Sequence, residues 1–152
     1  MLKGIDPLLS PDLLYVLAAM GHGDDLALVD GNHPAETVAA ATTSGRLIRL
    51  PGVPIEAAAR AILSVMPLDT FVEDPVRRME VVGDPNAMPE AQLAVQKEID
   101  SADCGKITVH GLERFDFYEA AKSAFAVVQV GDYRSYGCFL FRMGVLSPPS
   151  AP

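Results

Sequence analysis

Cysteine is scarce in this sequence, which contains only Cys104 and Cys138. Two cysteines are too few for a disulfide framework, and they lack the Cys-x-x-Cys spacing of redox and zinc motifs. We therefore expect reduced thiols in a reducing compartment, and we assign the protein to the cytoplasm.

Long apolar runs are missing as well. No stretch approaches the ~18 uninterrupted apolar residues that a membrane-spanning helix needs. Residues 1–7 contain no apolar run of signal-peptide length. We expect a chain that does not enter a membrane and is not exported by the signal-peptide route.

Basic residues are outnumbered by acidic ones. The sequence has 12 Lys and Arg against 20 Asp and Glu, which gives a formal net charge of −8 at pH 7. Such a charge repels phosphate backbones and anionic lipid headgroups. We therefore expect neither nucleic acid nor a membrane surface as a partner.

The composition that remains is that of an ordinary globular protein. Of the 152 residues, 49% are hydrophobic and 21% are charged, which lies inside the folded range and outside the disordered one. This length favours one domain with a single core. We expect the domain over residues 1–146 and a flexible tail over 147–152, where proline and serine dominate.

Helical patterns alternate with short apolar runs. Ser10-Pro11-Asp12 has the oxygen, the proline and the acid that begin a helix, and Gly21 follows at the expected end. The apolar residues between them recur at helical spacing. Further helices are predicted at residues 54–65, 89–99 and 115–123.

Six segments have the apolar character of strands: residues 26–29, 46–50, 79–82, 106–110, 124–130 and 137–145. Strands that alternate with helices indicate a single-domain α/β fold whose central sheet is mostly parallel, with helices on both faces. The last two strands follow one another across the turn Gly131-Asp132, which predicts an antiparallel closing hairpin.

His22 and Asp30 flank the first predicted strand. His22 lies between two glycines, where the backbone can turn sharply and a ligand can approach closely. Asp30 lies at the carboxyl end of the strand, where ligand crevices of α/β sheets form. An acid–base group with a carboxylate that either orients it or holds a hydroxyl is one interpretation. A histidine in a tight turn and an aspartate that opens a loop are the alternative.

Other patterns argue against several classes of site. Gly21-x-Gly23 precedes a strand and lacks the third glycine of a dinucleotide fingerprint. His33 and Glu36 lie three residues apart, but no zinc spacing accompanies them, so we expect no metal site. A Gly-x-Ser-x-Gly nucleophile elbow is missing. The aromatic run after Arg114 suits either a core or, through Arg114 and Tyr118, a site for sugar hydroxyls.

Several segments together resemble the L-fucose mutarotase and D-ribose pyranase (RbsD/FucU) family, and they are closer to the fucose mutarotase branch. The likeness spans essentially the whole chain, and the Met-Gly-His-Gly-Asp run ahead of Asp30 is its most specific part. The matching stretches are residues 1–10, 17–24, 30–35, 114–119 and 124–128, followed by Tyr136-Gly137.

The resemblance implies an RbsD-like three-layer fold and a set of site residues. It implies that His22 is the catalytic acid–base group, with Tyr118 as a further candidate, and that a second set of residues binds substrate. That second set is Asp30, Arg114, Tyr136, Gly137 and Cys138. Cys138 departs from the family, which has an asparagine there, and a thiol is a weaker hydrogen-bond partner than an amide. His33 stands where related chains often carry an aromatic residue.

The implied activity is that of an isomerase: a mutarotase that opens and recloses the ring of a free fucose-like or ribose-like aldose. Acid–base groups suffice for this reaction, so neither a cofactor nor a metal is expected. The resemblance also implies a homodecamer with pockets shared between neighbours, in which Tyr136 acts across an interface. Two alternatives stay open: a non-catalytic sugar-binding protein for uptake or sensing, and an enzyme that acts on another carbonyl compound.

Overall fold

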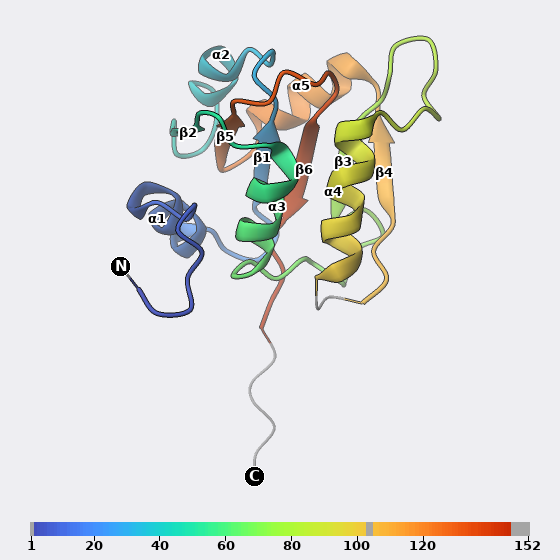
Figure 1. Ribbon diagram of the computed structural model, residues 1–152. Coiled ribbons are helices and arrows are strands. Elements are labelled where there is room, and N and C mark those ends of the chain that lie inside the picture. The colour runs from blue at the N-terminus through green and yellow to red at the C-terminus, as the bar shows by residue number, and fades with distance from the viewer. Residues whose placement is uncertain (1, 103–104, 147–152) are drawn as a thin grey trace.

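The computed structural model describes residues 2–102 and 105–146, which form a single α/β domain (Figure 1). Five helices and six strands lie in these residues. The helices are α1 (Pro11–Ala19), α2 (Ala35–Ala39), α3 (Ile55–Leu63), α4 (Glu90–Ser101) and α5 (Arg114–Lys122). The strands are β1 (Asp25–Val29), β2 (Leu47–Leu50), β3 (Val76–Met79), β4 (Val109–Leu112), β5 (Ala126–Val130) and β6 (Cys138–Arg142).

The six strands form one sheet in the order β2-β5-β1-β6-β3-β4. The pairs β2–β5, β5–β1 and β3–β4 are parallel. Strand β6 runs antiparallel to both of its neighbours, β1 and β3. The predicted antiparallel closing strand is therefore confirmed, but the predicted hairpin is wrong, because β1 lies between β5 and β6.

Helices cover both faces of the sheet, as predicted. One core cluster joins α1, α3 and α4 to one face, with Leu13, Ile62 and Val95 among its buried members. The other joins α2 and α5 to the opposite face, with Val38 and Phe117 at its centre. Figure 1 shows the two groups of helices on either side of the strands. The sheet is thus buried on both faces, and only its edges and ends are available for a site.

The first helix begins as the sequence predicts. The Ser10 hydroxyl oxygen accepts a hydrogen bond from the Leu13 amide at 3.2 Å, and Pro11 is the first helical residue. The helix ends at Ala19, one residue before the cap Met20. The left-handed turn that follows is at Gly23 (φ 89°), not at Gly21.

Two predicted strands are displaced and one helix was not predicted. Strand β3 lies at 76–79 instead of the predicted 79–82. The prediction missed it because Arg77 and Arg78 are charged, so the segment lacks the apolar pattern of a buried strand. Both side chains are buried with polar partners: Arg77 pairs with Asp25 at 2.5 Å, and Arg78 donates to the Gln92 side chain at 3.2 Å. Strand β4 lies at 109–112 instead of the predicted 106–110. Helix α2 was not predicted, because its five residues are too few to show a helical period.

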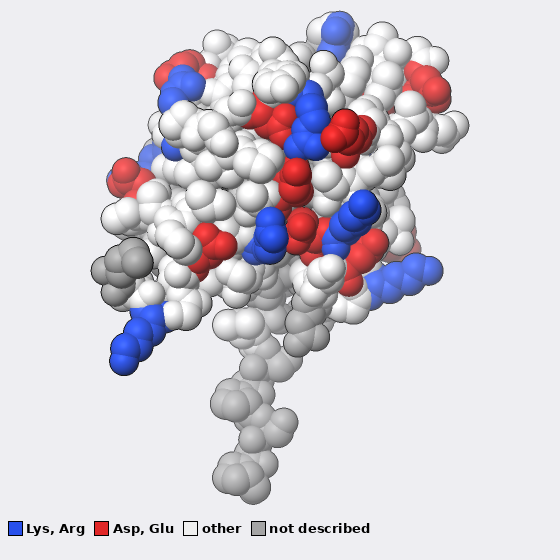
Figure 2. Space-filling model, in the orientation of Figure 1, with Lys and Arg blue, Asp and Glu red and all other residues white. Residues whose placement is uncertain are grey.

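Charges of both signs lie close together on the surface. On the face drawn in Figure 2, acidic and basic side chains are interspersed along the seam between α3 and α4. Among the residues described, no helix is both long and apolar enough to cross a bilayer. Cys104 and the predicted tail 147–152 lie outside the described residues.

Candidate functional site

A pocket of about 320 Å³ opens at the carboxyl end of β1. Its wall combines carboxylate, guanidinium, phenol, amide, imidazole and thiol groups. The lining residues are Asp30, Asn32, His33, Met79, Arg114, Tyr118, Ser135, Tyr136 and Cys138. In sheets of this kind, ligand sites form beyond the carboxyl ends of the strands. The pocket therefore lies at the place that the position of Asp30 predicts.

Asp30 organises the floor of this pocket. Its carboxylate accepts hydrogen bonds from the backbone amides of Asn32 (2.9 Å) and Gly137 (3.0 Å), and it lies 3.6 Å from the Cys138 sulfur. Burial raises the pKa of Asp30 above its usual value, although these hydrogen bonds lower it. The carboxylate joins the end of β1 to the start of β6, so that both chain segments face the same cavity.

Tyr136 has an unusual backbone. It is the one non-glycine residue with a positive φ (63°) in the described part of the chain. A bulky side chain in this conformation is strained by ~1–2 kcal/mol. The strained turn is fixed at the Tyr136 carbonyl by the Gln92 side chain at 2.8 Å and at Gly137 by Asp30. Backbone strain of this kind concentrates at ligand sites.

Gly137 has little room for a side chain. A Cβ atom there would lie 3.3 Å from the Ile55 side chain and 3.4 Å from the Asp30 Cβ. A larger residue would press directly on the carboxylate side chain that holds the pocket together. Gly137 thus shapes the pocket through its backbone, and its amide is the group that contacts Asp30.

Helix α5 brings Arg114 and Tyr118 to the other side of the pocket. Glu113 caps this helix by accepting from the Phe115 amide at 2.7 Å. Arg114 and Tyr118 are four residues apart, so they lie on the same helical face. The Arg114 guanidinium lies 4.6 Å above the Phe115 ring, and its Nε is buried without a hydrogen-bond partner among the residues that the structure describes.

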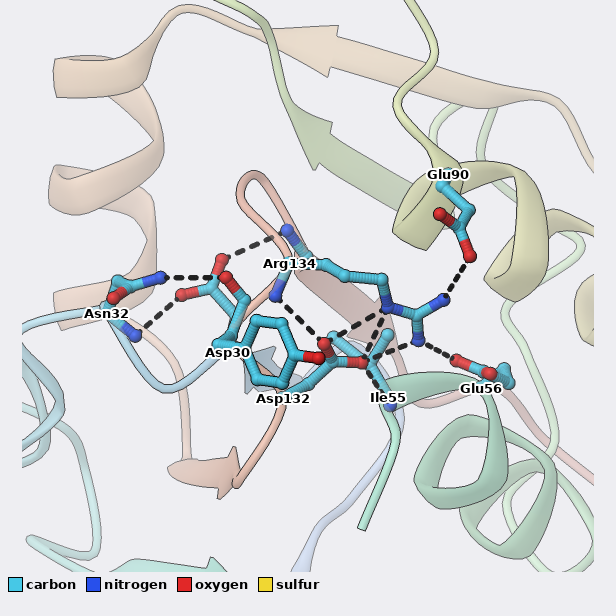
Figure 3. Close-up of polar contacts among 9 residues, drawn as sticks. Asp30, Asn32, Ile55, Glu56, Glu90, Asp132 and Arg134 are labelled. Atoms are coloured by element: carbon cyan, nitrogen blue, oxygen red, sulfur yellow. Dashed lines mark hydrogen bonds and ion pairs between the residues drawn. The ribbon is translucent and has the colours of Figure 1, made fainter. Parts of the chain in front are cut away.

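A network of charged groups fixes the loop between β5 and β6, which carries Tyr136. The Arg134 guanidinium contacts Asp132 at 2.6 Å, Glu56 at 2.5 Å and Glu90 at 3.3 Å (Figure 3). Arg134 holds the pKa of Asp132 at about 2, mainly through a side-chain hydrogen bond. Asp132 also accepts from the Ile55 amide at 3.1 Å, which caps α3 from another element.

His22 lies at the opposite end of β1. Its Nε2 is 3.1 Å from the carboxylate of the buried Asp69, and its ring meets Phe71 edge-on at 5.7 Å. The His22 side chain is 47% exposed. A strand of five residues extends ~16 Å, so His22 does not reach the pocket of its own chain. The interpretation that Asp30 orients His22 is therefore wrong; Asp69 does so.

The structure thus brings together six of the seven predicted site residues. The predicted residues that surround one cavity are Asp30, Arg114, Tyr118, Tyr136, Gly137 and Cys138, with Gly137 contributing its amide. Tyr136 shares the pocket with Asp30 of its own chain, and His22 is the residue that stands apart.

Two supporting residues were not predicted. Asp69 lies in an irregular segment with no recognisable spacing around it, and Gln92 is one polar residue within an otherwise ordinary helix. Gln92 is fully buried and donates to the carbonyls of both Met79 and Tyr136. A polar residue on the buried side of the α4 stripe was the only available signal.

The fold and the pocket define an α/β protein with a compact polar pocket at one end of its sheet. Residues 3–146 match the model of the RbsD / FucU transport protein family. The chain belongs to this family.

Known relatives resemble the chain along nearly its whole length. The fucose mutarotase of Mus musculus is 42% identical over 150 residues, which is 95% of each chain. The crystal structure of protein Atu2016, which is assigned to sugar binding without a stated reaction, covers 97% of both chains at 48% identity and a TM-score of 0.93. The fucose mutarotase of Streptococcus pneumoniae, solved with L-fucose, is 35% identical, with a TM-score of 0.85 over 96% of this chain and all of that one.

Proposed function

We propose that this protein is a monosaccharide mutarotase of the fucose type. The observation that carries the proposal is the convergence of Asp30, Arg114, Tyr118 and Tyr136 on one pocket of monosaccharide size. Relatives that carry the name fucose mutarotase support it, because they cover the whole domain at 36–43% identity.

The reaction requires two proton transfers. A proton leaves the anomeric hydroxyl while another reaches the ring oxygen, and the open-chain aldehyde then recloses on either carbonyl face. Each positioned acid or base contributes ~10²–10⁴-fold in rate, or ~3–5 kcal/mol of barrier. In this proposal His22 is one such group and Tyr118 is the second. Asp30 and Arg114 hold sugar hydroxyls in hydrogen bonds.

The His22 imidazole reaches the sugar from a neighbouring copy of the chain. One subunit presents two half-sites: the pocket at the carboxyl end of β1, and the pair His22–Asp69 at the amino end. Exposed aromatic rings lie beside both. Phe71, beside His22, is 72% exposed, and Phe115, beside Arg114, is 61% exposed. Large exposed apolar residues are typical of surfaces that become covered by a partner.

Shared sites require a closed homo-oligomer, because each subunit must donate one half-site and receive the other. We propose the decamer that the family resemblance implies, in the cytoplasm, where the free thiol of Cys138 stays reduced. Light scattering of the purified protein measures the number of subunits.

Anomer exchange on candidate aldoses, measured by saturation-transfer NMR, tests the proposed reaction. We expect the wild-type protein to accelerate exchange of at least one aldose. His22→Ala should lower that exchange by ~10²–10⁴-fold, because a positioned acid–base group is lost. Sugar binding should change little. His110→Ala, a histidine on β4 outside the pocket, is the matched control and should keep wild-type exchange.

A non-catalytic sugar-binding protein is the second candidate. The separation of His22 from the pocket within one subunit favours it, since a monomer would bind a sugar without the acid–base group. Wild-type protein that binds aldoses in its native assembly and never accelerates their exchange would decide for this candidate.

A further inference from the structure

The Tyr136 hydroxyl is held by the backbone of a neighbouring loop. Its oxygen accepts a hydrogen bond from the Val82 amide at 3.3 Å. Within residues 2–102 and 105–146 the hydroxyl donates to no other group. Tyr136 lines the pocket and is only partly buried. A phenol both accepts and donates, so an oxygen that accepts from an amide keeps its own proton for another acceptor.

Val82 lies in a tight turn that fixes the direction of its amide. Residues 81–84 are closed by a hydrogen bond from the Asp84 amide to the Val81 carbonyl at 3.1 Å. Gly83, the third residue, has a φ of 82°, whereas φ of Val82 is negative. This combination is typical of a type II turn. The Val82 side chain is 58% exposed, so the contact with Tyr136 depends on the backbone of Val82 and not on its side chain.

The loop that carries this turn is anchored to the groups that hold the Tyr136 backbone. It joins β3 to α4 over residues 80–89 and projects from the same end of the sheet as the pocket (Figure 1). Arg78 donates to the Pro85 carbonyl at 2.8 Å and to the Gln92 side chain at 3.2 Å. Gln92 in turn donates to the Tyr136 carbonyl at 2.8 Å. The backbone and the phenol of Tyr136 are thus fixed by one connected set of hydrogen bonds.

We propose that Val82, through its backbone N–H, is a positioning residue for sugar binding, which holds the Tyr136 phenol so that its proton is directed to a sugar oxygen. The inference rests on the proposed function in that it takes the pocket to be a sugar site. It goes beyond that function by giving the loop between β3 and α4 a role in affinity. Because Tyr136 binds the sugar and transfers no proton in the proposed reaction, the effect falls on Kd and KM and not on kcat.

Val82→Pro removes this N–H and preserves the turn. Proline is favoured at the second position of a type II turn. The preceding residue, Val81, lies in a β-bridge with Asp84 and is therefore extended, as a residue before proline must be. We expect the variant to weaken binding by about three- to tenfold, the worth of one neutral hydrogen bond. Calorimetry on the native assembly measures it, with whichever of L-fucose, D-galactose and D-ribose the wild type binds most tightly. The conservative variant Val82→Ala keeps the amide and should retain the affinity.

A background without the phenol oxygen shows whether the effect passes through Tyr136. Tyr136→Phe keeps the ring and lacks the hydroxyl. In this background, addition of Val82→Pro should leave the sugar affinity unchanged, because the two substitutions remove the same hydrogen bond. Urea unfolding of the four proteins separates affinity from stability. In exchange kinetics, Val82→Pro alone should raise KM by the same factor as Kd and leave kcat within about twofold of wild type.

Three outcomes decide between the inference and the proposed function. Unchanged affinity in Val82→Pro, or an equal loss of affinity with and without the Tyr136 hydroxyl, would overturn the inference while anomer exchange persists. A loss of affinity that depends on Tyr136, in a protein that never exchanges anomers, would refute the proposed catalysis and leave this inference standing. Failure of the wild-type assembly to bind any of the three sugars would refute both.

Discussion

At the scale of single residues, Asp30 contributes most to the pocket. It is buried, and one carboxylate serves the amides of Asn32 and Gly137 as well as the Cys138 thiol. It therefore both builds the cavity and presents an acceptor to it. The position of Asp30 after a buried strand was readable from the sequence. Its contacts with Gly137 and Cys138 were not, because those two residues lie more than a hundred positions further along the chain.

Replacement of Asp30 tests whether it both stabilises the cavity and presents an acceptor to it, as an exposed surface acid would not. Asp30→Asn puts an amide NH₂ group against a backbone N–H donor, so one hydrogen bond is lost and two donors face each other. We expect the free energy of unfolding to fall by ~1–3 kcal/mol and anomer exchange to be lost. Urea unfolding and exchange NMR measure the two effects. The exposed Asp84→Asn is the control, and equal behaviour of the two variants would contradict this role.

His33 makes a distinct contribution to the pH dependence of stability. Its pKa is about 4 in the folded protein and ~6.5 in an unfolded chain. Between these values the unfolded state binds more protons, so His33 lowers the free energy of unfolding as the pH falls from 6.5 to 4, by up to ~3 kcal/mol. His33→Phe should remove this part of the decline. Urea unfolding at pH 7.5 and pH 4.5 measures it, and identical declines in both proteins would refute the burial of a neutral ring.

At the scale of elements, the loop between β5 and β6 is the part of the fold that shapes the site. It approaches the turn after β2 so closely that a Cβ on Gly131 would lie 2.3 Å from the Gly52 nitrogen. Through its carboxylate and carbonyl, Asp132 then ties the loop to α3 and to Gly31. The loop ends in the strained Tyr136. Packing of this loop between two elements therefore positions one wall of the pocket.

Arg134 should stabilise this loop more than an exposed arginine stabilises its surroundings. Arg134→Met leaves the buried Asp132 carboxylate without its main partner. Because Arg134 itself is partly exposed, we expect a loss of ~1–3 kcal/mol in the free energy of unfolding, below that of a fully buried pair. Anomer exchange should fall several-fold. Arg60→Met, which breaks only the more exposed contact with Glu98 at 3.7 Å, should cost less than ~1 kcal/mol. Equal losses in thermal or urea unfolding would contradict the account.

Elements with a strong period or a cap were predictable, and elements with buried charge were not. The α1 start follows from Ser10 and Pro11, and β1 and β5 follow from short, mainly apolar runs. The prediction placed strand β3 three residues too late, because two adjacent arginines, Arg77 and Arg78, indicate a surface segment. Their buried partners, Asp25 and a side chain of α4, are distant in the sequence and could not be predicted. The place of β6 beside β1 also escaped prediction, since neighbours in the chain are the usual neighbours in a sheet.

At the scale of the whole molecule, the two ends of β1 carry the two groups of residues that we propose as half-sites of a shared site. The pocket with Asp30 and Arg114 lies at one end, and His22 with Asp69 lies at the other. The family resemblance implied Asp30, Arg114 and His22 but not Asp69, and it attributed the contact across an interface to Tyr136. We propose His22 for this contact instead, because Tyr136 already lines the pocket of its own chain.

Complementation between two inactive variants tests the shared site most directly. His22→Ala loses one half-site and Asp30→Asn the other, so neither assembly should exchange anomers alone. The two variants are co-expressed with different tags, and assemblies that contain both chains are purified. If the chains mix at random, about a quarter of the interfaces pair an intact His22 from one chain with an intact Asp30 from its neighbour. The account predicts about a quarter of wild-type exchange in this mixed assembly. No exchange above that of the separate variants, in an assembly shown to contain both chains, would contradict it.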